Sequence, residues 1–144
     1  MSGFYSSTDF HHEKFSAHGV YEVHMENGVF ICTLTGPMNI EGILALGRVR
    51  RVCVEESKVG NTVAAIVEFR KSMMMSPEAL ELYSTQFSQH YEELHSTFKV
   101  AYVVAKEVEG RSIMLPFFSE IFSKNKVIWQ AFEEFGRAKI WINS

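Results

Sequence analysis

Two segments of the chain, Thr62–Phe69 and Phe98–Ala105, are almost continuous apolar runs of strand length. A strand that is apolar on both faces is typical of the centre of a sheet that helices cover on both sides. Segments with the spacing of amphipathic helices precede and follow each run. Because strands that alternate with helices are joined by right-handed crossovers, the pattern predicts an α/β fold with a largely parallel sheet.

The sheet is predicted to begin with a hairpin. Val20–Met25 and Val29–Leu34 have the composition of strands, and Glu26-Asn27-Gly28 separates them. An Asn-Gly pair tolerates the positive φ angles of a tight turn between two strands. We therefore expect an antiparallel β-hairpin at one edge of the sheet.

Four helices are predicted, two of them from a helix-start signal as well as from helical spacing. Asn39 is a suitable N-cap for a helix with apolar residues every three or four positions. In Ser76-Pro77-Glu78, the serine can accept a first-turn amide, the proline loses no hydrogen bond and the glutamate complements the helix dipole. The remaining predicted elements are a strand at Val127–Phe132 and helices at Ser112–Lys124 and Glu133–Asn143.

These elements predict one α/β domain, with a mixed, mostly parallel five-stranded sheet, an N-terminal β-hairpin and about four helices. The length of 144 residues suits a single domain with one core. Residues 1–18 are polar and lack periodicity, so they are predicted to form a flexible N-terminal tail. The domain itself is expected to span residues 19–144.

Charge and hydropathy narrow the classes of partner and location. The net charge is −3, and Arg48, Arg50 and Arg51 form the only tight group of basic residues in the sequence. Such a group is typical of a solvated helix face. The sequence therefore predicts no nucleic-acid partner, which would require a basic stripe. No apolar run approaches the ~20 residues of a membrane span. Cys32 and Cys53 lie in apolar patterns that predict buried free thiols. With no secretory pattern in the first residues, these features favour a cytoplasmic protein.

Motifs of the common catalytic classes do not occur in the chain. There is no Gly-x-Ser-x-Gly elbow, no phosphate-binding P-loop and no Gly-x-Gly-x-x-Gly. His90 and His95 do not share a helix face, and Asp9 is the only aspartate. The sequence therefore predicts no catalytic residues, no metal site and no cofactor.

A few short segments carry a resemblance to a known family. They are Leu34–Asn39 before the first predicted helix, Met75–Ala79 at the start of the second, and Val127–Phe132 followed by Ala138 and Trp141-Ile142. Together with the order of elements, they resemble the SpoIIAA-like branch of the STAS fold over about residues 19–143. The resemblance implies a small regulatory or ligand-sensing module that generally has no catalytic activity.

The phosphorylation motif of that fold is altered here. Anti-sigma-factor antagonists of the STAS type carry an Asp-Ser pair, usually followed by a small residue and Gly, and a partner kinase phosphorylates the serine. The corresponding segment, Glu68–Ser76, contains neither Asp nor Gly. Ser72 and Ser76, together with Arg70, are the candidates for phosphorylation or partner contact, since a helix N-terminus accommodates a phosphate. The alternative is that one serine is a loop residue and the other a helix cap.

Methionines gather in the segments that follow two predicted strands. Flexible thioethers suit an adaptable apolar pocket, and open α/β sheets bind ligands at the carboxyl ends of their strands. An acyl chain or another apolar ligand could be bound there, although ordinary core packing is the alternative interpretation. The candidate ligand-binding residues are Met38, Met73, Met74, Met75, Phe117 and Phe118.

Two functional hypotheses follow from these observations. The first is a non-enzymatic regulatory or protein-interaction module, with a contact surface centred on residues 70–80. The second is a carrier or sensor of a small apolar, lipid-like ligand. In either case an exposed edge strand, or the Phe-rich segment Pro116–Phe122, could support a homodimer.

Overall fold

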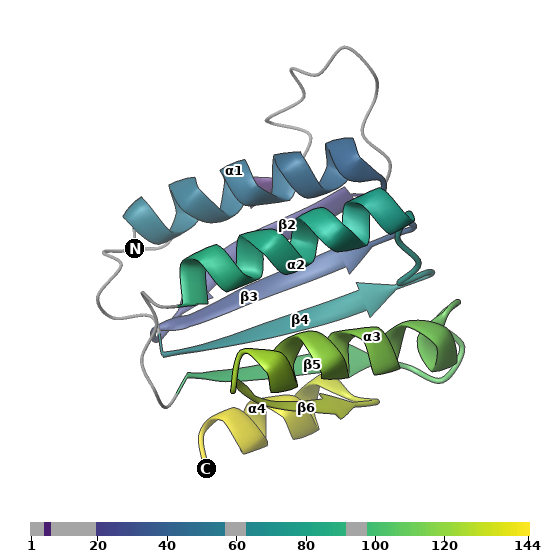
Figure 1. The fold of residues 1–144 in the computed structure, drawn as a ribbon. Coiled ribbons are helices and arrows are strands. Elements are labelled where there is room, and N and C mark those ends of the chain that lie inside the picture. The colour runs from purple at the N-terminus through teal and green to yellow at the C-terminus, as the bar shows by residue number, and fades with distance from the viewer. Residues whose placement is uncertain (1–4, 7–19, 57–62, 92–97) are drawn as a thin grey trace.

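The computed structural model describes residues 5–6, 20–56, 63–91 and 98–144 (Figure 1). One six-stranded sheet, in the order β1-β2-β3-β4-β5-β6, forms its centre. Strands β1, β2 and β3 pair antiparallel, whereas β3 to β6 are parallel, which confirms the predicted α/β class. The strands are β1 Tyr5–Ser6, β2 Val20–Glu26, β3 Val29–Thr35, β4 Ala64–Arg70, β5 Lys99–Val104 and β6 Ile128–Phe132.

The short strand β1 lies within the segment predicted as a tail. Tyr5 pairs with Val23 and Ser6 with Glu22, so β1 extends the sheet beyond the predicted hairpin. The other residues of the predicted tail up to residue 18 lie outside the described part of the chain.

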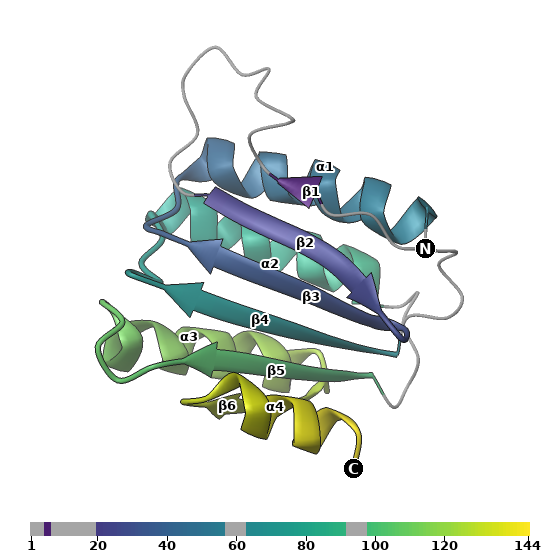
Figure 2. The same cartoon turned by 180° about the vertical axis from the view of Figure 1, so that it is seen from behind.

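The four helices of the described residues cover the two faces of the sheet unequally. Helices α1 (Ile40–Glu56), α2 (Pro77–Tyr91) and α3 (Arg111–Lys124) lie on one face, and α4 (Phe135–Ile142) lies on the other (Figures 1 and 2). The predicted N-cap of α1 is confirmed, because the Asn39 side-chain oxygen accepts the Gly42 amide at 2.9 Å. No described helix is long and apolar enough to cross a membrane.

Side chains of the central strands alternate between the two faces. In β5, Tyr102 packs towards the three-helix face, whereas Ala101 and Val103 pack towards α4, and all three are buried. This burial on both faces explains the continuous apolar run in the sequence. Cys32 is buried and forms no disulfide, as predicted, whereas the side chain of Cys53 lies outside the described residues.

Two buried tyrosines of the larger core are expected to make the stability of the protein depend on pH in alkali. The Tyr21 hydroxyl donates to the Gly42 carbonyl, and the Tyr102 and Tyr83 hydroxyls lie 2.5 Å apart. Burial raises the pKa of both Tyr21 and Tyr102 well above the ordinary value of 10.0.

Above pH 10 the unfolded chain would therefore ionise these phenols while the folded protein would not. These two tyrosines should leave the free energy of unfolding nearly unchanged well below pH 10. Above pH 10 the free energy should fall with a slope that approaches about 1.4 kcal/mol per pH unit for each buried tyrosine. Urea unfolding at several pH values between about 9 and 11 measures this slope. Tyr102→Phe should reduce the slope by one such increment, and an unchanged slope would contradict the assignment.

Candidate functional site

Three segments meet at the carboxyl end of the sheet. The residues after β4 lie between the β3–α1 connection and the β5–α3 connection, and isolated bridges join Met38 to Met75 and Ser72 to Glu109. Lys71 adopts a positive φ of 66°, which turns the chain out of β4. We call residues 70–76 the strand-end segment.

Backbone hydrogen bonds hold the strand-end segment from both sides. Met38 donates its amide to the Met74 carbonyl at 2.9 Å, and Ser76 donates to the Met38 carbonyl at 3.3 Å. On the other side, Met73 donates to the Glu109 carbonyl and Glu109 donates to the Lys71 carbonyl, both at 2.9 Å. The segment is therefore fixed to both neighbouring connections.

Ser72 is a buried residue of this segment, with only 4% of its surface exposed. Its hydroxyl donates to Glu109 Oε1 at 2.7 Å and accepts the Met74 amide at 3.2 Å. A phosphate on Ser72 would lie against the Glu109 carboxylate, and like charges repel. Phosphorylation at Ser72 would thus require this hydrogen bond to break and the segment to open.

Ser76 acts as the N-cap of α2. Its hydroxyl oxygen accepts the Ala79 amide at 3.2 Å, and Pro77 is the first residue of the helix. The helix start predicted from Ser76-Pro77-Glu78 is therefore confirmed. Because its hydroxyl makes this hydrogen bond, Ser76, the second candidate phosphorylation site, has a structural role.

Arg70 and Lys71 are the exposed cations of the strand-end segment. An Arg70 guanidinium nitrogen lies 3.4 Å from Glu68 Oε1, two residues earlier in β4. Exposed pairs of this kind contribute little to stability, so Arg70 can leave Glu68 for a partner at little energetic cost.

The predicted apolar ligand residues divide into core and surface groups. Met38, Met73, Met75 and Phe118 are buried in one hydrophobic core, whereas 47% of Phe117 is exposed. Met74 is half-buried and packed so closely on Gly110 that a Cβ there would overlap its sulfur. The structure thus brings four of the six candidates together as core residues, and Phe117 lies apart on the outer side of α3.

A hollow of about 470 Å³ lies beside the strand-end segment, at the ends of β4 and β5. Open α/β sheets bind ligands in this position. Arg70 was among the candidate site residues predicted from the sequence, whereas Glu107, Glu133 and Glu134 were not, because they come from connections far away in the sequence. Its lining residues are Glu68, Phe69, Arg70, Lys71, Val103, Ala105, Glu107, Val108, Glu133, Glu134 and Phe135.

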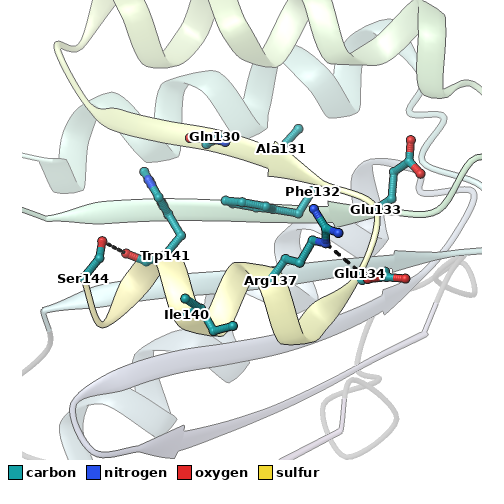
Figure 3. A pocket seen from close by; sticks show the side chains of 9 residues that line it. All are labelled: Gln130, Ala131, Phe132, Glu133, Glu134, Arg137, Ile140, Trp141 and Ser144. Carbon is teal, nitrogen blue, oxygen red and sulfur yellow. Dashed lines mark hydrogen bonds and ion pairs between the residues drawn. The ribbon is translucent and has the colours of Figure 1, made fainter.

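A second and larger hollow, of about 760 Å³, runs along β6 beside α4 (Figure 3). We call it the edge groove. Arg137 and Glu134 form an exposed ion pair of 3.4 Å at one end of it. No sequence motif marks this groove, because it arises from the way α4 packs back across the sheet. The residues that line it are Gln130, Ala131, Phe132, Glu133, Glu134, Arg137, Ile140, Trp141 and Ser144.

No protein-family model matches the chain, and no curated protein matches it in sequence. The resemblance to SpoIIAA-like STAS domains therefore stays a prediction. Within the described residues, no group of three or more His, Cys, Asp or Glu side chains is placed to hold a metal ion.

Proposed function

We propose that the protein is a cytoplasmic, non-enzymatic regulatory module that acts by binding another protein. The observation that carries the proposal is the strand-end segment itself. It is held by hydrogen bonds to both neighbouring connections and leads directly into α2, yet it exposes two cations, Arg70 and Lys71. A fixed backbone that presents charged side chains loses little conformational entropy when a partner binds.

The outer face of α2 extends this surface. Glu78, Glu81 and Thr85 are exposed and recur at helical spacing, whereas Ala79 is buried against the core. The proposed contact surface is therefore polar and carries both signs of charge. Such a surface favours a partner chosen by electrostatic complementarity rather than by apolar area.

The alternative, a carrier of an apolar ligand, has less support. Met38, Met73, Met75 and Phe118 pack against other core residues, and none of them lines either of the two hollows. An acyl chain bound among them would have to displace side chains that already fill the space. Native mass spectrometry of the freshly purified protein would nevertheless detect such a ligand as extra mass that denaturation removes.

The proposed contact surface can be tested by reversing its exposed charges. Affinity capture with the wild-type protein should recover a partner that the Arg70→Glu, Lys71→Glu double variant binds at least about tenfold more weakly, since charge reversal at a contact costs more than 1.4 kcal/mol. The binding is then measured by calorimetry with the purified partner.

A matched control is the Lys124→Glu, Lys139→Glu double variant. It makes the same change in net charge and also breaks one exposed ion pair, that of Lys139 with Glu26 at 2.8 Å. This control should bind the partner as the wild type does. If both double variants lose binding equally, or if neither does, residues 70–80 are not the contact surface.

A further inference from the structure

Strand β6 forms one edge of the sheet and carries no residue that would discourage pairing. Within the described residues β6 pairs only with β5, and its sequence, Ile-Trp-Gln-Ala-Phe, contains no charge and no proline. Edge strands of stable monomers are usually protected by charged residues, by proline, by bulges or by a covering element. At the opposite edge, by contrast, β1 adds to β2.

The edge groove lies along this open strand. The groove is lined by Gln130, Ala131 and Phe132 of β6 and by Ile140 and Trp141 of α4, and Figure 3 shows the Trp141 ring rising from α4 towards β6, next to the Phe132 ring. Ile128 is 44% exposed and Ile140 is 74% exposed. The groove therefore combines unpaired backbone with apolar side chains, which are the two features that an added strand uses.

The sequence around β6 is complementary to itself. An antiparallel pairing of two copies centred on Gln130 sets Ile128 of each copy opposite Phe132 of the other. Continued beyond the strand, the same register would bring Lys126, in the turn that follows α3, close to Glu134 of the second copy at both ends of the paired strands. Apolar pairs within the strand and opposite charges at both ends stabilise one register over its neighbours.

We propose that the edge groove is the interface with a second copy of this chain, joined antiparallel through β6 about a two-fold axis at Gln130. Such an axis lies perpendicular to the sheet, so the α4 helices of both copies lie on the same face of one continuous sheet. Five paired residues alone bury less than the roughly 1,200–2,000 Å² of a stable interface. The exposed surface of Ile140 and Trp141 beside the seam supplies the additional apolar area. The inference is independent of the function proposed above.

Sedimentation velocity tests the interface with two charge variants. The wild type should sediment as a dimer. In a dimer of Lys126→Glu, a carboxylate at position 126 would face Glu134 at both contacts. In a dimer of Glu134→Lys, an amine at position 134 would face Lys126 at both contacts. Because like charges repel, the dimer of each variant alone should dissociate on the order of tenfold more readily. An equal mixture of the two variants restores both opposite-charge contacts and should sediment as a dimer again, which a folding defect could not produce.

An apolar pair of variants tests the seam itself. Ile128→Lys should yield monomer, whereas Ile113→Lys, at an exposed isoleucine on α3, should leave the dimer intact. Circular dichroism checks that both variants are folded. A monomeric wild type overturns the proposal, as does a dimer that Ile128→Lys leaves unchanged. A mixture of charge variants that stays dissociated overturns the proposed register.

Discussion

Replacing Phe118 by alanine should lower the free energy of unfolding by about 3–5 kcal/mol. The Phe118 side chain is fully buried, and its ring lies 5.1 Å from that of Tyr102, 5.5 Å from Tyr83 and 5.9 Å from Phe69 between centroids. The substitution leaves a cavity among rings whose backbone belongs to β4, β5, α2 and α3, so the site cannot collapse easily. Equilibrium unfolding in urea, monitored by fluorescence and circular dichroism, measures the loss.

The neighbouring residue supplies the control for that measurement. Phe117→Ala makes the same chemical change one position earlier, on a ring that is already half in solvent, and should change stability by no more than about 0.5 kcal/mol. A similar loss for both variants would contradict the placement of α3. A small loss for Phe118→Ala alone would show that the core beneath α3 is loosely packed.

The fold was accessible from the sequence because its strongest signals are local. Asn27-Gly28 predicted the hairpin turn, and both residues have positive φ angles. Ser76 and Asn39 predicted helix starts that their side-chain hydrogen bonds confirm. Strand β1 was missed because two residues are too short to show the alternation that identifies a strand.

The site was less accessible because strand register, not sequence spacing, assembles it. Ser72 was singled out, but its partner Glu109 lies 37 positions away in the sequence. The parallel pairing of β4 with β5 brings their following segments together, and no local pattern reports that register. The adjacent residues Phe117 and Phe118 were likewise grouped, although a helical step of about 100° places one outside and the other inside.

Gly36→Ala is the second substitution with a large expected effect. A Cβ at Gly36 would overlap the carbonyl oxygen of Ser72 and lie 3.2 Å from its carbonyl carbon. Both atoms are backbone, so no side chain can rotate away. Ser72 cannot shift either, because its own side chain and the amides of Met73 and Met74 hold the strand-end segment in place. We expect a loss of about 3 kcal/mol or more in the free energy of unfolding.

Gly136→Ala is the control, and it should have the opposite sign. Gly136 is the second residue of α4. Apart from its chain neighbours and the nearby helix backbone, no atom of the described residues lies within 4 Å of a Cβ at this position. Alanine restricts the unfolded chain more than glycine does and favours the helix, so stability should rise by about 0.5–1 kcal/mol. The free energy of unfolding of both variants is measured in urea. The comparison distinguishes the effect of the close backbone contact at Gly36 from any general effect of adding a methyl group. If Gly36→Ala were as stable as the wild type, the strand-end segment could not lie as close to Gly36 as these contacts require. The rigid surface proposed for partner binding would then lose its basis.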